Sequence, residues 1–114
     1  MKQYWRIKKG GIMPEFSTPF KGNEFKRKLN ENELVRAIRF SIASEFEAIQ
    51  LYEQLKDSTD NEKAKKLLSE VAGDEKEHVG NFLQLLKILA PDEENYYKEG
   101  WQEATDVMGI SPEH

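Results

Sequence analysis

The sequence predicts an all-α protein, a long antiparallel two-helix hairpin plus a short C-terminal helix, and three observations support this fold class. Residues 30–58 contain no glycine or proline, and their apolar residues recur at intervals of three and four. Residues 68–89 repeat this spacing of apolar residues after a short polar turn. Residues 92–109 form a weaker helical segment that Gly109 and Pro112 close. At 114 residues the chain holds one domain at most.

Residues 1–30 show no sustained period and contain Gly10, Gly11, Pro14, Pro19 and Gly22, so we expect an irregular arm. The arm carries 8 Lys/Arg and 2 Asp/Glu, so it is basic. Residues 31–114, the body of the protein, carry 9 Lys/Arg and 19 Asp/Glu, so the body is acidic. This basic arm should be attracted to the acidic residues 31–114 of its own or a neighbouring protomer and pack partly against a neighbouring protomer. The alternative is a solvated arm without a partner. Met13 is a second candidate start for translation.

The first long helix should begin at Asn30, because asparagine is a strong N-cap and Glu33 follows three residues later, as in a capping box. Two adjacent rows of residues then form its inward face. The first row is Leu34, Ile38, Ser41, Glu45, Ala48, Tyr52 and Leu55, and the second is Val35, Ile42, Phe46 and Ile49.

The second long helix should be capped by Thr59 or Asp60, with Glu62 in its first turn. Pro91 should end it, or begin the next helix at its first position with Ala90 near the cap. Its inward row is Leu68, Val71, Glu75, His78, Phe82, Leu85 and Leu89. We therefore divide the chain into the arm 1–30, a helical domain 31–110 and a tail 111–114.

Composition excludes several classes of site. The chain has no cysteine, so disulfides, iron–sulfur clusters, thiolate zinc sites and thiol catalysis are excluded. No apolar run approaches the roughly 20 residues that span a bilayer, and no apolar segment follows the basic N-terminus as in a secretory signal. We expect a cytoplasmic protein without a membrane partner. The acidic body disfavours nucleic acid and favours cations.

Two carboxylates and one imidazole interrupt the apolar rows: Glu45 in the first helix, and Glu75 and His78 in the second. Burying an ionisable side chain without a partner is costly. Three ionisable side chains facing one seam therefore suggest a shared ligand. The spacing Glu75-x-x-His78 places both side chains on one helical face. Carboxylate oxygens with an imidazole nitrogen suit iron, manganese or zinc better than calcium.

These donors make up half of a known arrangement. A di-iron carboxylate bundle takes one glutamate from each of two helices and one Glu-x-x-His from each of two others. A two-fold dimer of this hairpin would supply both halves in a four-helix bundle. Two alternatives need no metal: His78 as a core histidine bonded to Glu45, or a polar seam that fixes the register of a coiled coil. Tyr52 is either a redox-active or hydrogen-bonding group near the site, or an ordinary core tyrosine.

The paired motifs "SEFEAIQLYEQ" and "GDEKEHVGNFLQLL" resemble those of the encapsulated ferritins, the ferritin-like cargo of encapsulin nanocompartments. The resemblance covers roughly residues 31–110. It implies a two-helix protomer that dimerises around a di-iron ferroxidase centre, five such dimers in a decameric ring, and an encapsulin shell around the ring. It also implies that Glu45, Glu75 and His78 bind iron, with Tyr52 beside them.

The same family has an acidic site on the first helix through which metal enters. One of its two glutamates matches Glu47, but the other position is Ser44 here. The remaining off-row acids, Glu70, Asp74 and Glu77, should form a solvated face. Relatives commonly carry a C-terminal shell-targeting peptide, whereas this chain ends in "GISPEH", and some relatives are fused to the shell protein. The competing functions are a rubrerythrin-like di-iron peroxide reductase and a metal-free helical adaptor that docks through its basic arm.

Overall fold

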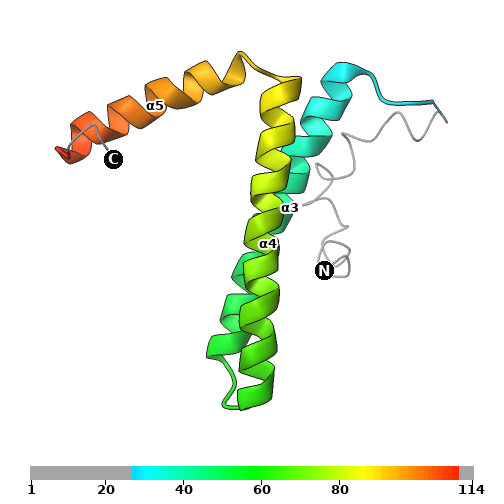
Figure 1. The fold of residues 1–114 in the computed structure, drawn as a ribbon, viewed down its shortest axis with the longest axis vertical. Coiled ribbons are helices and arrows are strands. Elements are labelled where there is room, and N and C mark those ends of the chain that lie inside the picture. Colours follow the sequence, from blue (N-terminus) through cyan, green and yellow to red (C-terminus); the bar gives the residue numbers. More distant parts are fainter. Residues whose placement is uncertain (1–26, 111–114) are drawn as a thin grey trace, which may run out of the picture.

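The computed structural model describes residues 27–110, which form three α-helices (Figure 1). They are α3 (Glu31–Asp57), α4 (Glu62–Leu89) and α5 (Glu93–Met108). Helices α3 and α4 run antiparallel and pack along their length, so the predicted all-α hairpin with a third, shorter helix is confirmed. None of the described helices is both long enough and apolar enough to span a bilayer. Most of the predicted arm and the tail 111–114 lie outside the described residues, and dimerisation stays a prediction.

Helix α3 begins with the predicted capping box. The backbone N–H of Glu33 donates to Asn30 Oδ1, and the backbone N–H of Asn30 donates to Glu33 Oε1, both at 2.9 Å. The sequence did not reveal a third partner: Arg27 donates two hydrogen bonds of 2.8 Å to the Glu33 carboxylate. The bonds from Arg27 and from the Asn30 backbone lower the pKa of Glu33 to about 2. A charged clamp therefore fixes the first turn of α3.

The cap of α4 differs from the prediction. Asn61 is the N-cap, and its Oδ1 accepts a hydrogen bond of 3.0 Å from the backbone N–H of Ala64. The predicted caps, Thr59 and Asp60, both lie within the turn, where Thr59 Oγ1 accepts from the backbone N–H of Asn61 at 3.1 Å. The prediction was wrong because three consecutive residues can cap a helix, and only the turn geometry decides among them. Glu62 lies in the first turn as expected.

The core of the hairpin is one narrow stripe made of Ile38, Ile42 and Ile49 from α3 with Val79 and Leu86 from α4. On α4 the most buried residues, Ala72, Val79 and Leu86, lie one position after members of the predicted row. The predicted row itself lies at the edge of the core, where Leu85 is 37% exposed. In the first helix, Phe46 and Leu55 are likewise exposed despite their predicted inward positions. Two helices can cover only one stripe of each other, so a second apolar stripe stays open.

Helix α5 leaves the end of the hairpin where α3 begins and α4 ends, and it points away from both (Figure 1). No residue of α5 is buried. At its start, Glu93 pairs with Arg39 of α3, and Glu94 lies 3.4 Å from Lys87 of α4. At its end, Gly109 adopts φ 69°, a left-handed C-cap that favours glycine. Side-chain ion pairs, rather than a shared core, thus attach α5 to the hairpin.

Candidate metal centre

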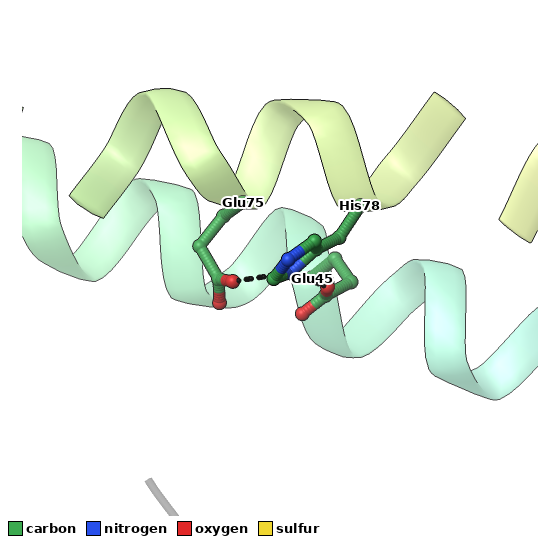
Figure 2. A group of neighbouring side chains, drawn as sticks. All are labelled: Glu45, Glu75 and His78. Carbon is green, nitrogen blue, oxygen red and sulfur yellow. Dashed lines mark hydrogen bonds and ion pairs between the residues drawn. The ribbon is translucent and has the colours of Figure 1, made fainter. Parts of the chain in front are cut away.

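The structure brings Glu45, Glu75 and His78 together in the middle of the hairpin (Figure 2). Glu45 comes from α3, and Glu75 and His78 come from successive turns of α4. One oxygen from each carboxylate and one imidazole nitrogen lie within 4.8 Å of one another. Among the described residues this is the only group of three or more potential metal-ligating side chains that meet so closely.

A single ring nitrogen holds the three groups together. His78 Nδ1 lies 2.9 Å from Glu45 Oε2 and 2.9 Å from Glu75 Oε1. An ionised carboxylate only accepts hydrogen bonds, so Nδ1 carries the proton and donates it between the two acids. The contact with Glu45 is the one that the core-histidine alternative predicted, but His78 is exposed and is not a core residue. The same contacts gather three ligand atoms where a cation could replace that proton.

The cluster perturbs the protonation of its members. Partial burial raises the pKa of Glu45, and the negative charge of Glu75 raises it further. For His78, desolvation alone would lower the pKa. The hydrogen bond to Glu75 and the charges of both glutamates outweigh it, so the pKa of His78 is raised. The pKa values of Glu45 and His78 are thus both raised, so this cluster favours positive charge between its two carboxylates.

The cluster opens to one side of the hairpin. The side chains of Glu45 and Glu75 are each 16% exposed, whereas that of His78 is 47% exposed. His78 is therefore less buried than its place in the predicted row suggested. The exposed apolar residues Leu85 and Leu67 share its side of α4, since they lie seven residues after it and eleven before it. A carboxylate–imidazole set of this kind is suited to a divalent transition metal.

The other predicted site residues lie outside this cluster. Tyr52 is half-buried on α3, about two turns after Glu45, and is not among the grouped donors. Glu47 is half-buried, and its Oε1 is a buried oxygen with no hydrogen-bond partner among the described residues. Ser44 is half-buried and offers no carboxylate. Glu70, Asp74 and Glu77 are exposed, which agrees with a solvated face.

Sequence reasoning missed one ion pair near the site. Lys76 Nζ, one residue after Glu75, lies 3.0 Å from Glu53 Oε2 on α3. The pair crosses from one helix to the other and so helps to fix their register beside the cluster. A lysine on an exposed position gives no local signal of its partner, because the partner depends on how the two helices are rotated against each other.

Comparison with known proteins identifies the family. The Rubrerythrin family model matches residues 37–109, a range that includes all three clustered side chains. The crystal structure of the encapsulated ferritin domain from Pyrococcus furiosus superposes with a TM-score of 0.73 at 36% identity, covering 75% of this chain and 88% of that one. The chain belongs to the encapsulated ferritin-like family. The predicted resemblance is thereby confirmed.

Two curated proteins also resemble this encapsulated ferritin-like chain. The ferritin-like–encapsulin shell fusion protein of Pyrococcus furiosus is 39% identical over 80 residues, which are 70% of this chain and 23% of the fusion protein. The encapsulin nanocompartment cargo protein EncC of Myxococcus xanthus is 42% identical over 73 residues, 64% of this chain and 56% of that protein. The chain thus spans less than two thirds of either relative.

Proposed function

We propose that this protein is a ferroxidase that oxidises Fe(II) to Fe(III) with dioxygen at a di-iron centre shared by two protomers. The observation that carries the proposal is the convergence of Glu45, Glu75 and His78, whose ligand atoms lie within 4.8 Å of one another on an open face. Fe(II) is the substrate, and each iron gives one electron to dioxygen. Manganese and zinc fit the same donors and would act as competitors.

The donor count supports a shared centre. A di-iron carboxylate bundle uses four glutamates and two histidines from four helices. One hairpin offers two glutamates and one histidine, so a second copy related by a two-fold axis would complete the set. The apolar stripe that contains His78 and Leu85 would be covered in the same step. Iron binding and burial of apolar surface thus favour the same dimer, which in the proposal is the unit of a decameric ring.

We further propose that the assembly works inside an encapsulin shell in the cytoplasm, for iron storage or detoxification. The names of the two curated relatives support this, since one is a shell fusion protein and the other a nanocompartment cargo protein. An open dimer or ring encloses no storage cavity of its own. Ferric product would therefore pass to the surrounding compartment.

The match to the Rubrerythrin family model supports a second candidate, a di-iron peroxide reductase. The two functions differ in the oxidant that reacts with Fe(II). Enzymes of that kind usually draw electrons through a cysteine-ligated iron centre, and this chain has no cysteine. Dioxygen is therefore the favoured oxidant. Anaerobic Fe(II)-loaded protein mixed in turn with dioxygen and with hydrogen peroxide separates the two, because the physiological oxidant should react faster.

The test of the main proposal is aerobic Fe(II) addition to the full chain. We expect consumption of dioxygen, growth of near-ultraviolet absorbance from ferric iron, and inhibition by Zn²⁺, which is redox-inert and competes for the same ligands. A metal-free adaptor would oxidise iron no faster than buffer alone, and that result would refute the ferroxidase proposal.

A further inference from the structure

Helix α5 exposes an amphipathic surface on which apolar and acidic side chains lie side by side. Tyr96 and Val107 are 72% and 87% exposed, and Trp101 and Met108 are also open. These four side chains form an apolar arc around the helix, with Tyr96 and Val107 at one edge. At 100° per residue, Glu99 and Glu103 lie beside that edge. Neither glutamate has an ion-pair partner among the described residues. In total α5 carries five acidic residues and one lysine, Lys98.

An isolated helix of this kind is only marginally stable. Even alanine-rich helices of about 12–15 residues are only marginally stable in water, and an interior glycine lowers helix stability further. Helix α5 has 16 residues with Gly100 in its middle, and none of them is buried. Its ordered state therefore calls for an occupant of its exposed face.

The N-terminal segment has the complementary composition. Residues 1–12, "MKQYWRIKKGGI", contain Lys2, Arg6, Lys8 and Lys9 and no acidic residue, so their net charge of +4 matches the −4 of α5. Between these cations stand Tyr4, Trp5 and Ile7, which could contact the apolar arc. Basic side chains that alternate with aromatic ones suit a surface where acids border Tyr96, since cations also bind aromatic faces.

The chain can bring the two together. The described part begins at Arg27, which is bonded to Glu33 at the start of α3. Helix α5 departs from the same end of the hairpin, held there by Arg39 and Glu93 (Figure 1). The intervening residues 10–26 reach up to about 55 Å when extended, and α5 is about 24 Å long. Tethering raises the effective concentration, so individually weak surface contacts can add up to a stable contact.

We propose that residues 2–9 dock on the acidic, apolar face of α5. The cations of the segment pair with Glu99 and Glu103, and its aromatic side chains cover the arc of Tyr96, Trp101 and Val107. The N-terminal segment is then a clasp that orders α5, and it takes no part in binding iron. This inference is independent of the ferroxidase proposal.

The test is a charge exchange in the full chain, read out by amide hydrogen exchange of residues 98–108. The Lys8→Glu/Lys9→Glu and Glu99→Lys/Glu103→Lys variants should each lose about tenfold in protection of α5, because each opposes like charges. Combining all four substitutions should restore the protection. The matched control, Lys63→Glu/Lys66→Glu, makes the same charge change on exposed positions of α4 and should leave α5 unaffected.

A carbodiimide, which joins lysine amines to carboxylates in direct contact, supplies the second readout. Cross-links from Lys8 or Lys9 to Glu99 or Glu103 support the clasp, whether they lie within one copy or between two. Protection of α5 that ignores the charge variants but rises with protein concentration would assign the surface to a second copy of the helix and overturn the proposal. An α5 that exchanges as fast as an unfolded chain in the unaltered protein would also overturn it.

Discussion

His78 of α4 and Glu45 of α3 meet across the hairpin, with 2.9 Å between the histidine Nδ1 and a carboxylate oxygen of the glutamate. The same nitrogen lies 2.9 Å from Glu75, so one proton joins residues from both helices. A divalent metal that replaces this proton would keep the same three groups together. The cluster is thus organised to hold a cation between its two carboxylates.

Glu45→Ala and His78→Ala should abolish ferroxidase activity and preserve helical content. Replacing a residue that only supports a metal ligand already lowers metal affinity or activity about 10–100-fold. Replacing a ligand itself should lower activity at least as much. Folding should tolerate these changes because the cluster lies outside the hairpin core. Oxygen consumption and far-ultraviolet circular dichroism measure the two effects. Glu70→Ala, which removes an exposed carboxylate from α4, is the control. Native rates in both ligand variants would show that the assigned centre is wrong.

The smallest iron-competent unit should be a dimer, and Leu85 should lie in its interface. Leu85 shares a helical face with His78, whereas Leu83, which is 45% exposed, lies five residues after His78 and so about 140° around the helix from it. Leu85→Asp should therefore give a monomer that neither retains iron nor oxidises it, while Leu83→Asp should leave the dimer intact. Native mass spectrometry with and without Fe(II) reports both species. A stable monomer that binds two irons would contradict this arrangement.

Metal affinity should fall as the pH is lowered. The pKa of His78 and that of Glu45 are both raised, so protons compete with the metal at higher pH than they would for isolated side chains. Calorimetric titration with Zn²⁺ at several pH values should show weaker binding and greater proton release on the acidic side. His78→Ala should bind weakly and lose most of this pH dependence. An affinity that is independent of pH would mean that the metal binds elsewhere.

Stability should respond to acid through Glu33. Its pKa is lowered from 4.5 to about 2, so the bonds from Arg27 and Asn30 stabilise the fold fully above the unfolded value and are lost as the pH falls from 4.5 toward 2. Other carboxylates also titrate in this range, so the comparison is with Glu33→Gln. Chemical denaturation at pH 5 and pH 2.5 should show a smaller loss in Glu33→Gln than in the unaltered protein. Equal losses would rule out the clamp as a source of acid sensitivity.

The sequence predicted those features of the structure that depend only on residues close together along the chain. The Asn30–Glu33 box and the one-turn spacing of Glu75 and His78 follow from helical geometry alone. The rotation of α4 about its own axis was harder to predict. Two adjacent apolar stripes run along α4, and either of them could face α3. The structure places the stripe with Val79 and Leu86 against α3. The pair of Arg39 and Glu93 was invisible for the same reason, since 54 residues separate them and the direction of α5 joins them. The dimer that would use the second stripe also lies beyond what one chain contains.

The turn between α3 and α4 has a consequence for the order of folding. Residues 58–61 join the helices, and closing so short a loop costs little entropy. The contacts between α3 and α4 can therefore form quickly within one chain, before any encounter between chains. Glu45, Glu75 and His78 lie within this fast-forming unit. Newly made protein would thus carry its candidate metal ligands before it finds a partner, and, if the proposed dimer is the active unit, assembly rather than folding would set the time at which oxidation begins.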